Sequence, residues 1–352
     1  MRAFPVLHLA SIAGSLLLAC APTLRAQPQA APAAPPVAPV APVAPVAPAD
    51  SALQSEMLRL LDALPAQSSM HALHVPSGRT VAVRADQLMS TMSVIKIPIM
   101  VQAYRDVEAG RLRLDERHTI REEDLRGGSG LLQRFAVGLA PTMRDLIDQM
   151  IITSDNTATD MILARVGKDR VNASLQALGF RDTRVIHTIG DFFRLLQAAY
   201  DPQRASWSDL QVFRARPPAD MSVATMTETR YRFTADAAMW LGSTTAREMN
   251  AMLRGIMTAS YANREHSDAM LRHLRGQFYN SRLPATLRYA SGVTVSHKTG
   301  DFPPISGSDV GIIDYPGGPI VISVFTNSNR GDFAVLEATI GKIAARLVEV
   351  WK

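Results

Sequence analysis

Near its C-terminus the chain reads DVGII (residues 309–313), DYPGGP (314–319) and IVISVFT (320–326). Two apolar runs of strand length, which flank a turn rich in proline and glycine, predict a pair of buried antiparallel strands. A third strand-like segment, residues 293–298, comes before them, and a helical pattern over residues 333–350 follows. This end of the chain therefore predicts several strands and a covering helix.

The other end of the folded part also predicts a helix and strands. Residues 51–64 have apolar side chains at helical spacing, with a capping box that starts at Ser51, and residues 70–75 and 80–84 read as a hairpin. Between the two ends, the segment from about residue 105 to about residue 274 has a pattern that predicts mostly helix. We therefore predict an α/β sandwich whose antiparallel sheet is built from both termini, together with an all-α subdomain.

Composition limits the classes of function. The chain has 352 residues with 37 Lys plus Arg and 32 Asp plus Glu, which gives a net charge of +5. The basic residues are scattered rather than gathered into a run, so we expect no nucleic-acid partner. The single cysteine, Cys20, excludes a disulfide or a multi-cysteine metal site in the predicted folded domain, residues 51–352.

The first fifty residues predict an export signal and a tether. Residues 1–26 combine an early arginine, an apolar stretch and a small-residue end, which is the pattern of a secretory signal peptide. The string that ends at Cys20 resembles a lipobox, so a lipid anchor competes with ordinary cleavage before Gln27. Residues 27–50, rich in Ala, Pro and Val, predict a disordered linker. We therefore expect an exported protein, either periplasmic or anchored at the outer membrane or cell surface.

A serine and a lysine three residues apart interrupt an apolar stretch at Ser93-Val-Ile-Lys96. In a helix this spacing places both side chains on one face, one turn apart. A serine hydroxyl is a weak nucleophile at its ordinary pKa, and an apolar setting favours the neutral amine of a lysine. The pair can therefore act as nucleophile and base. A helix cap followed by a surface lysine would produce the same pattern.

Two further polar motifs follow. In Ser154-Asp-Asn156, between two helical segments, the serine could relay a proton and the asparagine could hold a substrate amide and the lysine, although a plain helix N-cap has the same composition. In Lys298-Thr299-Gly300, at a strand end, the first two residues could bind a carboxylate and the glycine could let substrate backbone approach. A turn glycine at a strand end is the alternative. Each motif is common alone, but the three in this order are not.

Together the motifs resemble those of the penicillin-recognising serine hydrolases, most closely the class A β-lactamase catalytic domain. The resemblance covers roughly residues 51–352 and includes the strings GGSGLL (127–132) and STTAREM (243–249). It implies the β-lactamase and transpeptidase-like fold.

The same resemblance implies a role for each motif residue. Ser93 would be the acyl-enzyme nucleophile, Lys96 its base and Ser154 a proton relay. The backbone N–H groups of Ser93 and Asp301 would form the oxyanion hole. The expected substrate contacts are Asn156 for an amide, Lys298 and Thr299 for a carboxylate, and Gly300 and Asp301 beside them.

The sequence departs from the family at the base that hydrolyses the acyl-enzyme. Class A enzymes use a glutamate in a Glu-x-x-Leu-Asn loop, and no such string occurs between the second and third motifs. The interval from Ser154 to Lys298 is longer than the family's, which predicts an insertion at about 191–228. We prefer Glu228 as the deacylation base, with Asp191 as the alternative, and the absence of any dedicated carboxylate stays open.

The resemblance implies an exported serine hydrolase that opens a β-lactam ring through a Ser93 acyl-enzyme and releases the product with water, as a resistance enzyme would. Two alternatives stay open: a peptidoglycan D,D-peptidase or low-turnover penicillin-binding protein, and a sensor domain that is acylated once. We expect a small-molecule β-lactam or a peptidoglycan stem peptide as partner, a monomer, no metal and no organic cofactor.

Overall fold

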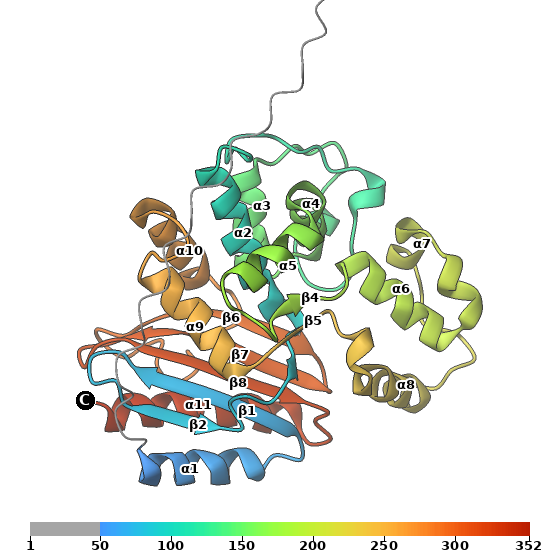
Figure 1. Cartoon of the computed structure of the whole chain (residues 1–352). Helices are drawn as coiled ribbons and strands as arrows, with labels where there is room; N and C mark the ends of the chain where they lie inside the picture. Colours follow the sequence, from blue (N-terminus) through green and yellow to red (C-terminus); the bar gives the residue numbers. More distant parts are fainter. Residues whose placement is uncertain (1–49) are drawn as a thin grey trace, which may run out of the picture. The chain divides into compact units, whose positions relative to one another are not determined.

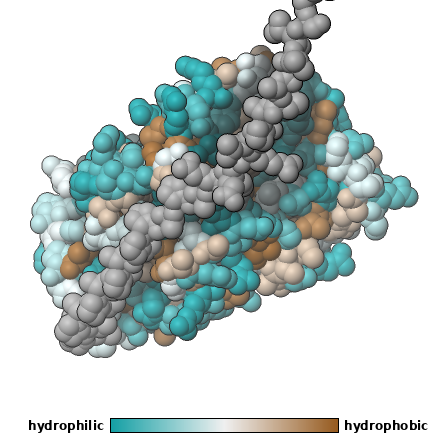
Figure 2. All heavy atoms as spheres, turned by 45° about the horizontal axis from the view of Figure 1, so that its top comes forward, coloured by the Kyte–Doolittle hydropathy of each residue, from teal (hydrophilic) through white to brown (hydrophobic). Residues whose placement is uncertain are grey.

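We describe residues 50–352 from a computed structural model of the chain. The predicted signal peptide, the lipobox at Cys20 and the linker up to residue 49 lie outside the described residues. Figure 2 shows a face on which hydrophilic residues are interspersed with small hydrophobic patches. Within residues 50–352, no helix has both the length and the apolar character needed to cross a membrane.

A five-stranded antiparallel sheet, in the order β2-β1-β8-β7-β6, forms the centre of the fold. Its strands are β1 (Gln67–His74), β2 (Thr80–Val83), β6 (Thr294–Phe302), β7 (Ser306–Asp314) and β8 (Ile320–Asn327). The N-terminal hairpin joins the C-terminal strands through β1 and β8, which pair from Gln67 opposite Asn327 to His74 opposite Ile320. The prediction of an antiparallel sheet built from both termini is therefore confirmed.

Helices α1 (Ser51–Asp62) and α11 (Phe333–Val350) lie together on one face of this sheet (Figure 1). They bury an apolar cluster with β1, β2 and β8. The predicted capping box at Ser51 is wrong in detail: the N-cap is Asp50, whose carboxylate accepts from the Leu53 N–H at 3.2 Å. Gln54, which would complete the box, instead accepts from the backbone of β2 at Ala82.

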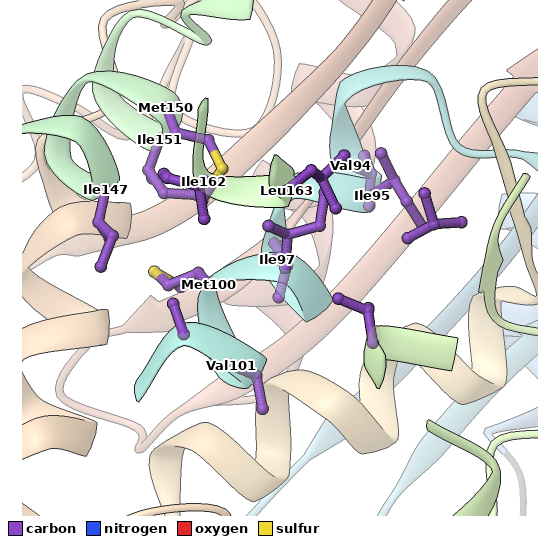
Figure 3. Packing of buried hydrophobic residues seen from close by; sticks show 14 of the residues in the cluster. Val94, Ile95, Ile97, Met100, Val101, Ile147, Met150, Ile151, Ile162 and Leu163 are labelled. Carbon is purple, nitrogen blue, oxygen red and sulfur yellow. The ribbon is translucent and has the colours of Figure 1, made fainter. Parts of the chain in front are cut away.

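The remaining helices are mostly on the other side of the sheet, where α9 contacts β1, β7 and β8. They are α2 (Lys96–Glu108), α3 (Met143–Ile152), α4 (Asn156–Val166), α5 (Lys168–Ala177), α9 (Ala246–Met257) and α10 (Arg264–Arg275). Helix α2 packs against α3 and α4 through apolar side chains from all three helices (Figure 3). The polar side chain at the start of α2 therefore enters an apolar environment.

Short elements complete the fold. Strands β3 (Met89–Ser90), β5 (Gly242–Thr244) and β4 (Arg184–Val185) form a second sheet in that order. The sequence analysis missed it because strands of two or three residues show no alternation. The 3₁₀ turns are η1 (Met92–Ile95), η2 (Glu122–Asp124), η3 (Leu132–Arg134), η4 (Pro202–Ser206) and η5 (Ala237–Met239).

The region where we predict an insertion, residues 191–228, is mostly helical. It includes α7 (Asp209–Phe213) and parts of α6 (Ile189–Tyr200) and α8 (Val223–Ala235). Helix α6 contacts α7, α8 and α4, and the three helices lie beside the end of the sheet (Figure 1). This region therefore brings its side chains close to the ends of the long strands.

Candidate active site

Ser93 lies at the entrance to helix α2. It belongs to the 3₁₀ turn η1, which runs directly into α2 at Lys96, so the two residues are one turn apart as predicted. Met92 has a φ of +41°, in the left-handed region that non-glycine residues rarely adopt, and this turns the chain into the helix. Ser93 lines a cavity of about 510 Å³. The candidate nucleophile is therefore accessible to a ligand.

The Lys96 amine is fully buried beside this cavity. Its Nζ donates to the Ser154 carbonyl at 2.7 Å, to the Ser154 hydroxyl at 3.1 Å and to Asn156 Oδ1 at 2.8 Å. Loss of solvation, followed by the positive charge of Lys298, lowers the pKa of Lys96 well below its usual value. The apolar packing of α2 (Figure 3) is the source of that desolvation. In its neutral form the amine has two N–H hydrogens, so it donates to at most two of these three acceptors and keeps a lone pair that can accept a proton.

Ser154 connects the two buried lysines. It stands between α3 and α4 with a φ of +55°, and its hydroxyl lies 3.1 Å from the Lys96 Nζ and 3.0 Å from the Lys298 Nζ. The next residue, Asp155, is the N-cap of α4, because its carboxylate accepts from the Ala158 N–H at 2.9 Å. The N-cap interpretation of the motif therefore holds for Asp155, while Ser154 lies between the two lysines.

The side chain of Asn156 is held by Lys96, Gly127 and Ser129, and it has donor capacity left. Its Oδ1 accepts from Lys96, and its Nδ2 donates to the Gly127 carbonyl at 2.8 Å, which leaves one Nδ2 hydrogen for a substrate amide. Ser129, to which the sequence analysis gave no role, lines the cavity and donates to the Ser154 carbonyl at 2.6 Å. The glycine-rich string around Ser129 is the sequence pattern that could have identified it as a residue of the site.

Lys298 is also fully buried, on strand β6. Its Nζ donates to the Ser154 hydroxyl and, at 2.9 Å, to the Thr299 carbonyl, while loss of solvation lowers its pKa to about 7. The Thr299 hydroxyl is buried and has no hydrogen-bond partner within residues 50–352. A buried hydroxyl without a partner is costly, although Thr299, like Gly300, is not among the residues that line the cavity.

Gly300 has a different role from the expected one. A Cβ at this position would lie 2.4 Å from the Thr91 carbonyl oxygen and 3.1 Å from Val94 Cγ2. The glycine therefore allows β6 to approach the turn that carries Ser93, rather than leaving room for substrate backbone. Gly300 is not among the residues that line the cavity.

Asp301 lines the cavity next to these groups, and its carboxylate pairs with Arg282. The Arg282 Nη2 also donates to Glu337 at 3.0 Å, and its Nη1 donates to the Ser308 carbonyl at 2.9 Å. One nearly buried guanidinium thus engages both carboxylates that line the cavity. Five side chains from the three motifs and the neighbouring Asp301 adjoin one cavity or contact each other at its wall: Ser93, Lys96, Ser154, Asn156, Lys298 and Asp301.

Comparison with known proteins identifies the family of the chain. A model of the "Beta-lactamase enzyme family" matches residues 52–351. The chain belongs to the β-lactamase enzyme family. A hydrolase of the serine β-lactamase and penicillin-binding superfamily is the class that this membership supports.

Individual relatives in this family are distant. Beta-lactamase L2 of Stenotrophomonas maltophilia is 30% identical over 126 residues, which are 36% of this chain and only 41% of that protein. A β-lactamase structure from Sphaerobacter thermophilus is 25% identical, with a TM-score of 0.67 over 86% of this chain and 98% of its own. An acyl-enzyme complex of a PBP-A mutant with penicillin G is 23% identical, with a TM-score of 0.68 over 88% of this chain and 99% of its own. The β-lactamase and transpeptidase-like fold is thus confirmed.

Within this β-lactamase-family domain, the expected deacylation base does not reach the cavity. Glu228 is exposed on α8 and accepts from Arg330 at 3.0 Å, a hydrogen bond that lowers the pKa of its carboxyl. Arg230, two residues further on, lines the cavity instead. Side chains two positions apart on a helix face different directions, so α8 cannot present both to the cavity.

Asp191, the alternative base, is also engaged elsewhere. It pairs with Arg194 and accepts from the Thr188 hydroxyl at 2.9 Å, and it does not line the cavity. Helix α6 contributes an apolar wall instead, made by Ile189, Phe192, Phe193 and Leu196. Within residues 50–352, each carboxylate that lines the cavity is bound to an arginine.

Proposed function

We propose that this protein is an exported penicillin-binding serine hydrolase, in which Ser93 forms a long-lived ester with a β-lactam or a peptidoglycan stem peptide. One observation carries the acylation step of this proposal. The Ser154 hydroxyl joins two buried amines of lowered pKa, Lys96 and Lys298, beside a cavity that Ser93 lines. This arrangement supplies a nucleophile, a proton acceptor and a proton relay.

Acylation then follows from the positions of these groups. The neutral Lys96 amine takes the proton of the Ser93 hydroxyl as the oxygen attacks the substrate carbonyl carbon. The negative charge that develops on the carbonyl oxygen is stabilised by the backbone N–H groups of Ser93 and Asp301. When the C–N bond breaks, the Ser154 hydroxyl gives a proton to the nitrogen and regains one from the adjoining amines. In a β-lactam the nitrogen stays attached to the acyl group.

Release of the acyl group requires a proton acceptor for the attacking water. A water molecule must lose a proton as it adds to the Ser93 ester, and the carboxylates of Asp301 and Glu337 are both engaged by Arg282. The apolar side chains of α6 offer no substitute. The sequence favoured steady hydrolysis with Glu228 as base, and the exposed position of Glu228 favours the low-turnover alternative.

Steady β-lactamase turnover remains the second candidate. It is favoured by Lys96 itself, because an amine whose pKa is lowered well below its usual value can deprotonate water after it has served in acylation. The two candidates share the first step and differ only in the rate of the second.

The deciding experiment follows nitrocefin hydrolysis and the intact mass of the protein together. We expect a burst of one product per protein, a slow phase after it, and an adduct that persists for minutes. Rapid linear turnover without an adduct would replace the proposal by the β-lactamase candidate. Labelling by a fluorescent penicillin should disappear in Ser93→Ala, and labelling that persists would refute the nucleophile.

Two variants test whether Glu228 is the base that activates water for deacylation. Glu228→Gln should leave the rate of adduct loss unchanged, because this carboxylate is at the surface and bound to Arg330. Lys96→Met should abolish acylation. Slower adduct loss in Glu228→Gln would restore Glu228 as the deacylation base.

Export is part of the proposal and is supported by the composition of residues 1–26. The mass of the mature chain distinguishes a start at Gln27 from a lipid-modified Cys20, and a full-length chain in the cytoplasm would refute export. Size-exclusion chromatography should give the mass of a monomer.

A further inference from the structure

One arginine in the cavity wall has no acidic partner. Arg230, on α8, is half-buried and lines the cavity, and its Nε donates to the Tyr200 hydroxyl at 2.5 Å. Within residues 50–352 no carboxylate oxygen lies within 4 Å of its guanidinium, and its two terminal nitrogens have no acceptor. Arg282, the other arginine of the cavity, holds two carboxylates. Arg230 is therefore the cavity's unneutralised guanidinium.

The surroundings of Arg230 strengthen its attraction for an anion. Its guanidinium carbon lies 5.9 Å from the centre of the Phe302 ring, and Phe302 packs edge-on against Phe192 with ring centres 5.7 Å apart. Aromatic walls exclude water, so a charge-assisted hydrogen bond formed here is stronger than one at an open surface. The bond to Tyr200 also fixes the guanidinium, which leaves its terminal nitrogens available for a planar carboxylate.

Arg230 lies beside Phe302 of β6, and the position of Phe302 along this strand indicates which part of a substrate Arg230 meets. Lys298 and Phe302 are four residues apart on this strand, or about 13 Å at the rise of a strand. Asp301, with its oxyanion N–H, lies between them. A substrate whose reacting carbonyl is held at Asp301 therefore has Lys298 on one side and Arg230 on the other.

The two sides of the reacting bond carry different groups. In a β-lactam and in a stem peptide, the carboxylate next to the leaving nitrogen belongs to the side that Lys298 and Thr299 are expected to bind. Arg230 then faces the acyl side. We propose that Arg230 is a specificity-determining residue that selects substrates with a carboxylate on the acyl group. This inference rests on the proposed function and gives the helical insertion a role in substrate choice.

Benzylpenicillin and carbenicillin provide a direct test, because they differ by one carboxylate on the acyl side chain. The second-order rate constant for Ser93 acylation by each is measured from intact mass, for the wild type and for Arg230→Gln, Arg230→Lys and Arg232→Gln. The last variant is the control, because Arg232 is exposed on the same helix and does not line the cavity. Differences in intrinsic reactivity cancel when the carbenicillin to benzylpenicillin ratio is compared between proteins.

We expect this ratio to fall about tenfold in Arg230→Gln, to fall less in Arg230→Lys, which keeps the charge, and to stay unchanged in Arg232→Gln. High salt should reduce the wild-type ratio, because the interaction is ionic. Equal ratios in the wild type and Arg230→Gln would overturn the inference, as would an equal loss in Arg232→Gln. If neither penicillin acylates the wild type, the proposed function itself fails, which is a distinguishable result.

Discussion

Replacing Lys298 with methionine should change the pH dependence of stability in a defined way. The buried amine has its pKa lowered from 10.5 to about 7 by loss of solvation. Below about pH 7 it is protonated in both the folded and the unfolded chain, and above about pH 10.5 it is neutral in both. Between these values the unfolded chain holds one more proton, so the free energy of unfolding of the wild type rises with pH, by about 1.4 kcal/mol per pH unit.

The variant loses this dependence. Summed over this shift in pKa, the burial of the amine costs the wild type about 5 kcal/mol of unfolding free energy below about pH 7. Lys298→Met removes this cost. The variant also removes the hydrogen bonds to the Ser154 hydroxyl and the Thr299 carbonyl, which costs about 1–3 kcal/mol at every pH. Lys298→Met should therefore be more stable than the wild type at pH 6 and less stable near pH 10.

Urea unfolding followed by circular dichroism at pH 6, 7, 8, 9 and 10 measures the difference. Lys96 is present in both proteins, but the positive charge of Lys298 is one cause of its lowered pKa, so the pKa of Lys96 should rise in the variant and add to the gain in stability at low pH. Lys342→Met, which removes an exposed lysine of α11, is the control and should show no crossover. A difference between Lys298→Met and the wild type that does not vary with pH would refute the reasoning.

Two other substitutions test the packing around the site. Gly300→Ala should cost about 1–3 kcal/mol of unfolding free energy, because its Cβ would lie 2.4 Å from a backbone oxygen just before η1. The control is Gly127→Ala, whose Cβ would meet nothing within 4 Å, and urea unfolding should show a smaller loss for it. Equal losses in the two variants would contradict the close contact at Gly300. Arg282→Leu should cost about 3 kcal/mol, because Asp301 and Glu337 lose their shared partner. Adding Glu337→Gln should recover part of that loss in thermal unfolding, and a further loss would argue against charge as the cause.

The sequence alone determined the parts of this protein that depend on neighbouring residues. Periodicity located the closing helix at residues 333–350, and the apolar runs located β7 and β8 to within a few residues. The spacing of Ser93 and Lys96 was sufficient to pair them, because residues three apart share a helix face wherever the helix lies. Local geometry is fixed by the backbone, so a local pattern can predict it.

Only the tertiary structure decided which of these local faces meet. The Lys96 amine reaches the Ser154 hydroxyl across 58 positions of sequence, and its desolvation comes from α3 and α4 packing around α2. Counting residues through the insertion selected Glu228 as the base, but the rotation of α8 turns Glu228 to the surface and Arg230 to the cavity. A sequence states which residues share a helix face; which face is buried depends on distant segments that pack against it, and that is settled by the whole fold.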